Sequence, residues 1–359
     1  MKIAVDARPL SAPLTGIGRY TYSLLQQLTK SEHEWYLYSD RPILSELPKA
    51  QNVNIRVGNA QGGTPGSLRW AQWQYVKWAR SDGIDVFWSP RHHLPLLLPK
   101  EIRSVVTIHD LVWKRYPETM QRKNFWLEKL LMSPSIRMSD RIICVSDFTF
   151  KEINHFYPNA TDRCVVIHEA ADNLTSPAEG EKVPEAPYLL FVGTMEPRKN
   201  LKTLLEAYAE LKAKEVPQLL IVGADGWGSL KIENLVRDLN IANRVAILGY
   251  VTESELNDLY RNAKCLLMPS LYEGFGLPAL EAMNHGTPVI YSENTSLAEV
   301  VGPGGIPVNP TLQSDISQAI RSIAKKEVRD KLSQLAVAQS SKFSWKTAAN
   351  QTLEVLIKS

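Results

Sequence analysis

Near its C-terminal end the chain contains the stretch Glu273-Gly274-Phe275-Gly276-Leu277-Pro278-Ala279-Leu280-Glu281-Ala282. The apolar run at 265–270 precedes this stretch and is typical of a buried strand that ends at a turn. Two glycines allow the backbone to approach a ligand closely, and a proline suits the first turn of a helix. The pattern therefore predicts a strand, a glycine loop and a helix N-terminus, which together bind phosphate through N–H groups and the helix dipole.

Two carboxylates belong to this stretch, Glu273 in the loop and Glu281 in the first turn of the expected helix. Carboxylates repel phosphate, but they accept hydrogen bonds from hydroxyl groups. A ligand with both a phosphate and a polyol accounts for both features, and a sugar nucleotide is such a ligand. The alternative is an ordinary helix start in which proline and glycine only shape the turn.

A second loop of the same kind follows the apolar run 188–192, which Gly193 ends. Apolar residues then recur at helical spacing from Leu201 onward, which places Arg198 and Lys199 between a strand and a helix. Cations are disfavoured beside a helix N-terminus, so we expect an anion there, and a diphosphate leaving group suits these two side chains. The alternative is a solvated basic pair at the start of a helix.

The stretch 273–282 and the segment Glu196-Pro197-Arg198-Lys199-Asn200 together resemble the group 1 retaining glycosyltransferases of GT-B fold, known as family four. The resemblance covers essentially the whole chain. It implies catalytic roles for Arg198 and Lys199 on the donor's diphosphate and for Glu273 on the hydroxyls of the transferred sugar. It also implies that the C-terminal domain binds the donor through Gly274, Phe275, Gly276, Leu277 and Glu281, the last of these on the ribose.

Length and composition fit two domains, because 359 residues exceed a typical single domain and 44% of them are hydrophobic. A formal net charge of +3 does not indicate nucleic acid as a partner. The three cysteines lie in apolar runs without metal-ligand spacing, which indicates buried thiols in a reducing cytoplasm. We expect no secretory signal, because Asp6 and Arg8 interrupt the first apolar run, and no run approaches the roughly 20 apolar residues of a membrane span.

Strand and helix patterns alternate twice along the chain, which predicts an α/β fold of two doubly wound parallel sheets. We expect two Rossmann-like domains that face a central cleft, as the GT-B resemblance implies. Residues 1–172 are assigned to an N-terminal acceptor-binding domain, 173–187 to a linker and 188–345 to the nucleotide-sugar-binding domain. The expected strands are 3–5, 35–38, 53–55, 86–88, 105–108, 142–145, 165–167 and 188–192, followed by runs that end at Val222, Leu248, Met268 and Tyr291.

The last segment, 346–359, has a helical pattern with Ser344 as its N-cap. In the resembling family such a helix packs back on the first domain. The alternative is a helix that completes the second domain.

A glycine loop in the first domain has the sequence Thr15-Gly16-Ile17-Gly18-Arg19-Tyr20. A dinucleotide-binding turn is the alternative interpretation, but the loop from Val5 is too long for it and Thr21 occupies the third glycine position. The resemblance instead implies that Gly16 and Gly18 lie beneath the donor's phosphates, with Arg19 at the start of the helix.

His109 ends the apolar strand 105–108, at the edge of the sheet where ligands bind. The resemblance implies a catalytic position for His109 beside the transferred sugar. We expect Asp110 to cap a local turn and to orient His109.

Two stretches of the first domain combine aromatic and basic residues. Residues 68–80 place Trp70, Trp73, Lys77 and Trp78 near one helical face, and residues 114–141 hold seven basic residues against three acidic ones. Such a composition is typical of interfacial membrane helices, and the hypothesis is that this domain rests on the anionic inner membrane to reach a lipid-linked acceptor. The alternative is that the tryptophans pack inward.

The expected reaction is retaining transfer of a hexose from a nucleotide diphosphate to a hydroxyl of a glycan or lipid-linked glycan. The resemblance implies that the departing phosphate accepts the acceptor's proton. No Asp-x-Asp motif occurs in the sequence, so we expect neither a metal nor another cofactor. The segments 108–111 and 195–200 resemble in particular those of bacterial mannosyltransferases of surface polysaccharide synthesis, which implies GDP-mannose. Rhamnosyl, glucosyl and N-acetylglucosaminyl transfer, a sugar-nucleotide 2-epimerase and a non-catalytic glycan-binding protein stay open as alternatives.

Overall fold

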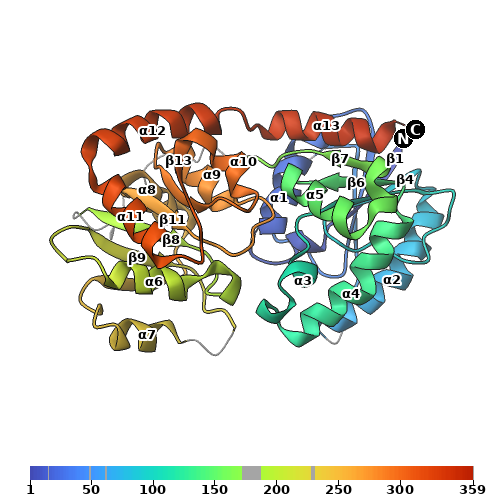
Figure 1. Cartoon of the computed structure of the whole chain (residues 1–359). Helices are drawn as coiled ribbons and strands as arrows, with labels where there is room; N and C mark the ends of the chain where they lie inside the picture. The colour runs from blue at the N-terminus through green and yellow to red at the C-terminus, as the bar shows by residue number, and fades with distance from the viewer. Residues whose placement is uncertain (15, 48–49, 61–62, 172–186, 228–230, 359) are drawn as a thin grey trace. The chain divides into compact units, whose positions relative to one another are not determined.

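The computed structural model describes residues 1–14, 16–47, 50–60, 63–171, 187–227 and 231–358 (Figure 1). The chain divides into two compact units. Unit 1 comprises Met1–Arg115, Arg122–Glu169 and Ser344–Ser359, and unit 2 comprises Tyr116–Gln121 and Ala170–Phe343. Nearly all of the predicted linker at 173–187 lies outside the described residues.

Unit 1 is built on a seven-stranded sheet of order β3-β2-β1-β4-β5-β6-β7, in which every neighbouring pair is parallel. Its central strands are buried along their length, so their sequences are continuously apolar rather than alternating. The strands are β1 (Lys2–Asp6), β2 (Glu34–Ser39), β3 (Val53–Val57), β4 (Val86–Ser89), β5 (Arg103–Ile108), β6 (Arg141–Cys144) and β7 (Cys164–Val166).

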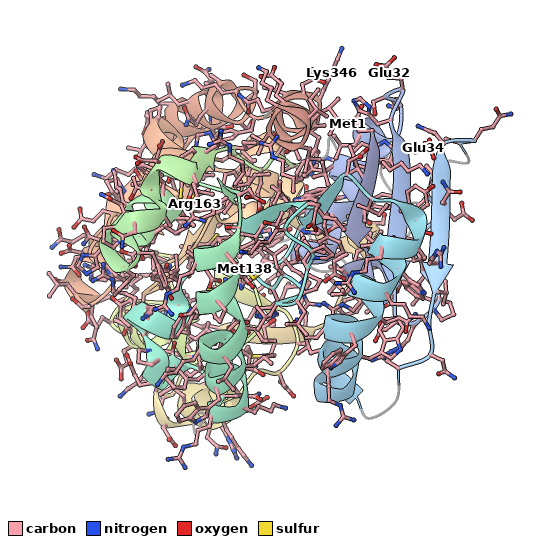
Figure 2. The ribbon with its side chains drawn as sticks, turned by 90° about the vertical axis from the view of Figure 1, so that its right-hand side faces the viewer. Met1, Glu32, Glu34, Met138, Arg163 and Lys346 are labelled. Carbon is pink, nitrogen blue, oxygen red and sulfur yellow. The ribbon has the colours of Figure 1, made fainter. Side chains whose placement is uncertain are left out.

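Helices connect and cover the strands of unit 1. Arg163 lies at the C-terminal end of α4, beyond Met138 (Figure 2), and donates to the carbonyl oxygens of Arg137, at 3.2 Å, and of Ser139. Such a cation stabilises the last carbonyls of a helix. The helical elements are η1 (Arg8–Leu10), α1 (Gly16–Leu28), α2 (Gly63–Asp82), α3 (Val112–Arg115), α4 (Arg122–Met138), α5 (Asp147–Phe156), η3 (Pro158–Arg163) and α13 (Trp345–Ile357).

The terminal helix α13 packs on α1 within unit 1. The Ser344 hydroxyl accepts a hydrogen bond from the Thr347 N–H, and the Trp345 ring meets the Tyr20 ring edge-on at 6.1 Å. The cap therefore starts the helix and the aromatic contact fixes its first turn.

Unit 2 is built on a six-stranded parallel sheet of order β10-β9-β8-β11-β12-β13. The strands are β8 (Tyr188–Val192), β9 (Gln218–Val222), β10 (Val245–Gly249), β11 (Cys265–Met268), β12 (Val289–Ser292) and β13 (Gly305–Val308). The helical elements are η2 (Pro117–Thr119), η4 (Pro197–Lys199), α6 (Leu201–Ala209), α7 (Ile232–Asp238), α8 (Glu253–Asn262), α9 (Leu277–Asn284), α10 (Leu297–Val301), η5 (Gly302–Gly304), α11 (Gln313–Ala324) and α12 (Lys326–Ser340).

The prediction of two doubly wound parallel sheets is confirmed. Strand β13 was not predicted, because it is short and contains a glycine and a proline. The segment Tyr116–Gln121 was placed in the first domain but groups with unit 2. The Tyr116 ring lies 6.0 Å from that of Tyr272, and the Trp227 indole N–H donates to the Thr119 carbonyl at 2.9 Å.

The prediction of a glycine loop at 15–20 is wrong for residues 16–20, because α1 already begins at Gly16 and Arg19 lies within its first turn. Thr15 lies outside the described residues. Over the part of the chain that the structure covers, every helix is too short or too polar to cross a membrane.

Candidate active site

The loops that follow β8 and β9 in unit 2 pack backbone against backbone. A Cβ atom on Gly223 would lie 2.1 Å from the carbonyl oxygen of Gly193, so only glycine permits this approach. The loop after β8 continues into η4, where the Leu271 N–H donates to the Arg198 carbonyl at 2.8 Å. Asn200 then ties the start of α6 to Pro269, because its side-chain amide donates to that carbonyl at 3.0 Å. These contacts hold Arg198 and Lys199 beside the loop that follows β11.

Arg198, Lys199 and Glu273 form one buried ionic cluster. The Lys199 ammonium donates to one oxygen of Glu273 at 2.6 Å, and the Arg198 guanidinium donates to the other at 3.2 Å. The Ser270 hydroxyl also donates to Glu273, at 2.7 Å. Glu273 is only 5% exposed and Lys199 only 8%. The anion expected beside the two cations is therefore supplied by the chain itself, and Glu196 adds a second carboxylate 2.9 Å from Arg198.

The charges of this cluster depend on one another. Burial by itself raises the pKa of the Glu273 carboxyl, but the charges of Lys199 and Arg198 outweigh burial and hold this pKa below its usual range. Glu273 is thus an anion that keeps two cations in place. An ammonium has three N–H donors, and Lys199 directs one of them at Glu273, which leaves the others for a further acceptor.

The glycine loop leads into α9 through a backbone conformation that favours glycine. Gly276 is the N-cap residue of α9 with φ of 104°, and a Cβ atom there would lie 2.4 Å from Cδ2 of Leu297. The Ser296 hydroxyl lies 2.9 Å from the carbonyl oxygen of Glu273 and 3.0 Å from that of Phe275, which fixes the loop. Gly274 is buried and Leu277 is the first residue of α9.

The side chain of Phe275 is buried and its ring meets that of Phe343 edge-on at 5.8 Å. A ligand at this loop would therefore contact the Phe275 backbone rather than its ring.

Glu281 lies one turn deeper in α9 than the sequence predicted. The prediction of the first turn is wrong because the helix begins at Leu277, so that no acidic residue belongs to that turn. The buried carboxylate of Glu281 accepts a hydrogen bond from the Tyr260 hydroxyl at 2.9 Å. Tyr260 therefore orients this carboxylate from the neighbouring helix α8.

His109 of unit 1 follows β5 and is held at three points. Its Nδ1 lies 2.9 Å from a carboxylate oxygen of Glu169, its Nε2 donates to the Pro90 carbonyl at 2.9 Å, and its backbone N–H donates to His92 at 3.2 Å. The prediction that Asp110 orients His109 is wrong, because Glu169 and Pro90 occupy the two ring nitrogens. Asp110 instead accepts the N–H of Val112 at 3.2 Å, which confirms its predicted role in a local turn.

Several residues around His109 were missed. His92 and His93 are buried, and the partly buried carboxylate of Glu128 lies 3.4 Å from His92 and 3.0 Å from His93. Burial by itself raises the pKa of Glu128, but the two histidines hold it well below its usual range. His92 and His93 follow β4 and Glu169 follows β7, so the rule that ligands bind at the carboxyl ends of parallel strands could have found these three residues, whereas Glu128 lies within α4.

The two glycines of α1 have different surroundings. Gly16 is exposed and a Cβ atom there would meet no atom, whereas one on Gly18 would lie 3.1 Å from the Pro9 carbonyl oxygen and 3.2 Å from Leu14. Gly18 thus serves close packing within unit 1, and Gly16 leaves space at the start of the helix.

Comparisons with known proteins show the family of this chain. Residues 172–339 match the family described as "Glycosyl transferases group 1", and residues 14–173 match the family described as "Glycosyltransferase Family 4". The "O-antigen chain mannosyltransferase B" of Escherichia coli is 32% identical over 98% of each chain. The chain belongs to the group 1 glycosyltransferases.

Two solved structures show the fold of this glycosyltransferase. Sucrose-phosphate synthase from Thermosynechococcus elongatus aligns over 99% of this chain and 98% of its own, with a TM-score of 0.82 at 21% identity. HepE from Anabaena, solved in complex with UDP and glucose, aligns over 99% of both chains, with a TM-score of 0.73 at 17% identity. At these identities the two structures are evidence for the fold alone.

Proposed function

We propose that this glycosyltransferase moves mannose from GDP-mannose, with retention of configuration, to a hydroxyl of a glycan or lipid-linked glycan in the synthesis of lipopolysaccharide or another surface polysaccharide. The observation that carries this proposal is the buried cluster of Arg198, Lys199 and Glu273 beside the N-terminus of α9. The name of the Escherichia coli relative supports mannose, and the complex of HepE with UDP and glucose supports a nucleotide-sugar donor.

In the proposed mechanism unit 2 binds the donor. Departure of the nucleotide builds negative charge on the diphosphate, and Lys199 and Arg198 would stabilise this charge together with the N-terminus of α9 at Gly276 and Leu277. Because Glu273 already holds the two cations, they need no reorganisation when the bond breaks. The Glu273 carboxylate would also accept sugar hydroxyls, and Glu281, which accepts a hydrogen bond from Tyr260, would contact the ribose.

His109 would contact the sugar as a positioning group rather than as a general base. Its two ring nitrogens lie against Glu169 and the Pro90 carbonyl, so neither nitrogen is directed at an acceptor hydroxyl. This favours a reaction in which the departing phosphate takes the acceptor's proton. We further propose that no metal takes part, because Arg198 and Lys199 supply cationic charge at the diphosphate.

A transfer assay tests the donor and the reaction class. Radiolabelled GDP-mannose, UDP-glucose and dTDP-rhamnose are incubated with the protein, with and without a bacterial lipid extract and with and without EDTA. We expect label to move from GDP-mannose into the lipid fraction at a rate that EDTA leaves unchanged, and NMR of the product to show the donor's anomeric configuration. Interconversion of the nucleotide sugar without an acceptor would identify an epimerase instead, and binding without turnover would identify a glycan-binding protein.

We also propose that unit 1 contacts an anionic membrane from the cytoplasmic side through its helices α2 and α4. Two tryptophans of α2 pack inward and one is available to a membrane. Trp70 and Trp78 are partly buried against each other, whereas Trp73 is 67% exposed. On α4, Trp126 is 52% exposed and the Lys129 ammonium lies 4.7 Å above its ring. Exposed aromatic rings beside lysines suit the interface of an anionic bilayer.

Flotation with lipid vesicles tests this contact. The protein is expected to float with vesicles that contain phosphatidylglycerol and to remain behind with phosphatidylcholine alone. Trp73→Ser and Trp126→Ser should each weaken flotation about tenfold, since each removes a large apolar side chain from the interface. Tyr250→Ser removes a comparably exposed aromatic ring from unit 2 and serves as the matched control. Equal flotation with both lipids would rule out the proposed electrostatic contact.

A further inference from the structure

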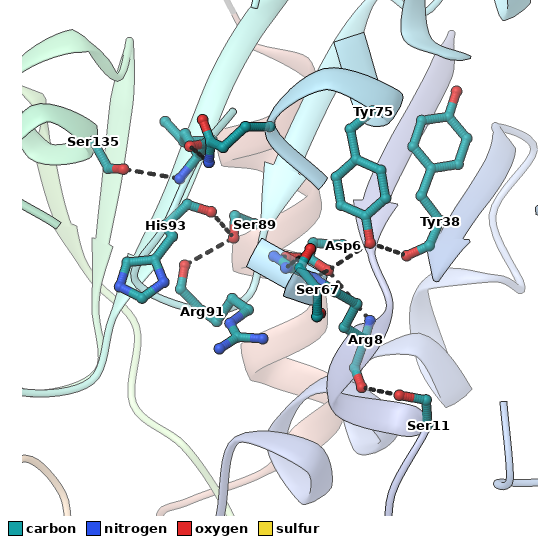
Figure 3. Close-up of polar contacts among 12 residues, drawn as sticks. Asp6, Arg8, Ser11, Tyr38, Ser67, Tyr75, Ser89, Arg91, His93 and Ser135 are labelled. Carbon is teal, nitrogen blue, oxygen red and sulfur yellow. Dashed lines mark hydrogen bonds and ion pairs between the residues drawn. The ribbon is translucent and has the colours of Figure 1, made fainter. Parts of the chain in front are cut away.

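Unit 1 contains two arginines, Arg8 and Arg91, at the carboxyl ends of two neighbouring strands. Arg8 follows β1 and Arg91 follows β4, and these strands pair in the centre of the sheet (Figure 3). The carboxyl edge of a parallel sheet is where ligands bind in open α/β folds. The two guanidinium groups have different surroundings.

The guanidinium of Arg8 is hydrogen-bonded within the unit through all three of its nitrogens. It donates to both oxygens of Asp6, at 2.9 and 2.5 Å, and to the carbonyl of Ser67 at 3.4 Å. The Tyr75 hydroxyl donates to the same carboxylate at 3.1 Å. Arg8 and Asp6 are both buried, so the two residues form a structural ion pair.

The guanidinium of Arg91, in contrast, forms no hydrogen bond or ion pair with any residue that the structure describes, although the residue is partly buried. Only its backbone is engaged, because the Ser89 hydroxyl donates to the Arg91 carbonyl at 2.8 Å. Figure 3 shows the guanidinium extending from its loop toward the side of Arg8 with no contact drawn to it. A planar fork of five donors therefore remains available at this edge of the sheet.

The nearby carboxylates do not neutralise Arg91. Of the two that attract it, Asp6 is bound by Arg8 and Tyr75, and Glu128 is bound by His92 and His93. Burial lowers the pKa of Arg91, and the neighbouring charge of Arg8 lowers it further. The two carboxylates raise this pKa, but they do not outweigh the lowering. A partly buried cation without a partner is costly, and an anionic ligand would remove that cost.

We propose that Arg91 binds an oxyanion of the acceptor substrate, either a phosphate ester or a sugar carboxylate. A guanidinium recognises both groups through two parallel hydrogen bonds. Arg91 precedes His92, whose ring accepts the backbone N–H of His109, so the anion would bind close to the residue expected beside the transferred sugar. The identity of the ligand as an acceptor rests on the proposed function, whereas anion binding by Arg91 does not.

Calorimetric titration tests anion binding without any transfer reaction. Methyl phosphate and glucuronate are titrated separately into protein that carries Lys199→Ala, which removes one of the two cations proposed to bind the diphosphate in unit 2. We expect one of them to bind, and Arg91→Gln to weaken that binding about tenfold or more, as for loss of a charge-assisted hydrogen-bond pair. Binding of methyl phosphate alone would assign a phosphorylated acceptor, and binding of glucuronate alone an acidic sugar.

Two further variants make the result interpretable. Arg137→Gln removes an exposed arginine of the same unit and should leave binding unchanged. Arg91→Lys keeps the charge but loses the fork, and should bind more weakly than the parent and more tightly than Arg91→Gln. Equal binding in the parent and in Arg91→Gln, or no binding of either anion to the parent, would overturn the proposal. In the transfer assay, Arg91→Gln should raise the acceptor KM about tenfold.

Discussion

Lys199→Ala is expected to lower kcat for sugar transfer by about 10²- to 10³-fold, as for loss of one preorganised donor to a developing anion. Lys199 is buried, donates to Glu273 at 2.6 Å and retains N–H groups for the departing diphosphate. Its loss should therefore act on the transition state in which that charge develops. Steady-state kinetics with the preferred donor measures the effect, and an unchanged kcat would remove Lys199 from the mechanism.

Because Lys199 also pairs with a buried carboxylate, its loss has a cost in stability that must be separated from the cost in rate. Glu273 keeps Arg198 and Ser270 as partners, so we expect the free energy of unfolding to fall by about 1–3 kcal/mol. In the double variant, Glu273→Gln is added to Lys199→Ala and removes the carboxylate's charge. This variant should recover part of the lost stability without restoring turnover. Lys202→Ala removes an exposed lysine on α6, 3.9 Å from Glu206, and should change neither quantity measurably.

The elements of the fold were predictable because their signals are local. Every predicted strand has a counterpart in the structure, and Ser344 caps α13 as its sequence pattern indicated. The errors are also local in origin. Gly16 begins α1 where a loop was expected, since glycine is a weak helix former. Strand β13 carries Gly305 and Pro307, and both are depleted in strands.

The site was predictable in its residues but not in its pairings. The motifs identified Lys199 and Glu273 separately, yet these are 74 positions apart in the sequence and their ion pair depends on the neighbouring positions of β8 and β11 in the sheet. His109 and Glu169 are 60 positions apart. Asp110 was chosen as the partner of His109 because it is adjacent in the sequence, whereas the folded chain offers a buried carboxylate from the segment after β7. Strand order, which sequence patterns do not contain, decides such contacts.

Gly276→Ala is expected to lower the free energy of unfolding by about 2–5 kcal/mol, the sum of backbone strain and overpacking. Gly276 has φ of 104° and ψ of 51°, and a Cβ atom there would lie 2.4 Å from Leu297 Cδ2. Gly83 is the matched control, because it has φ of 65° but a Cβ atom there would meet nothing within 4 Å. Gly83→Ala should therefore cost only about 1–2 kcal/mol, the strain of a left-handed residue.

Urea denaturation of both variants separates the two contributions at Gly276. Leu297→Ala in the Gly276→Ala background removes the clash and should recover part of the loss, whereas in the parent it should only destabilise. Equal costs for Gly276→Ala and Gly83→Ala would show that the Leu297 contact is relieved by movement of α10. A larger cost for Gly276→Ala than for Gly83→Ala would mean that the N-terminus of α9 is held rigidly against α10, as a preorganised phosphate site requires. In that case Gly276→Ala should also raise the donor KM, because relief of the clash must displace the backbone that would bind the diphosphate.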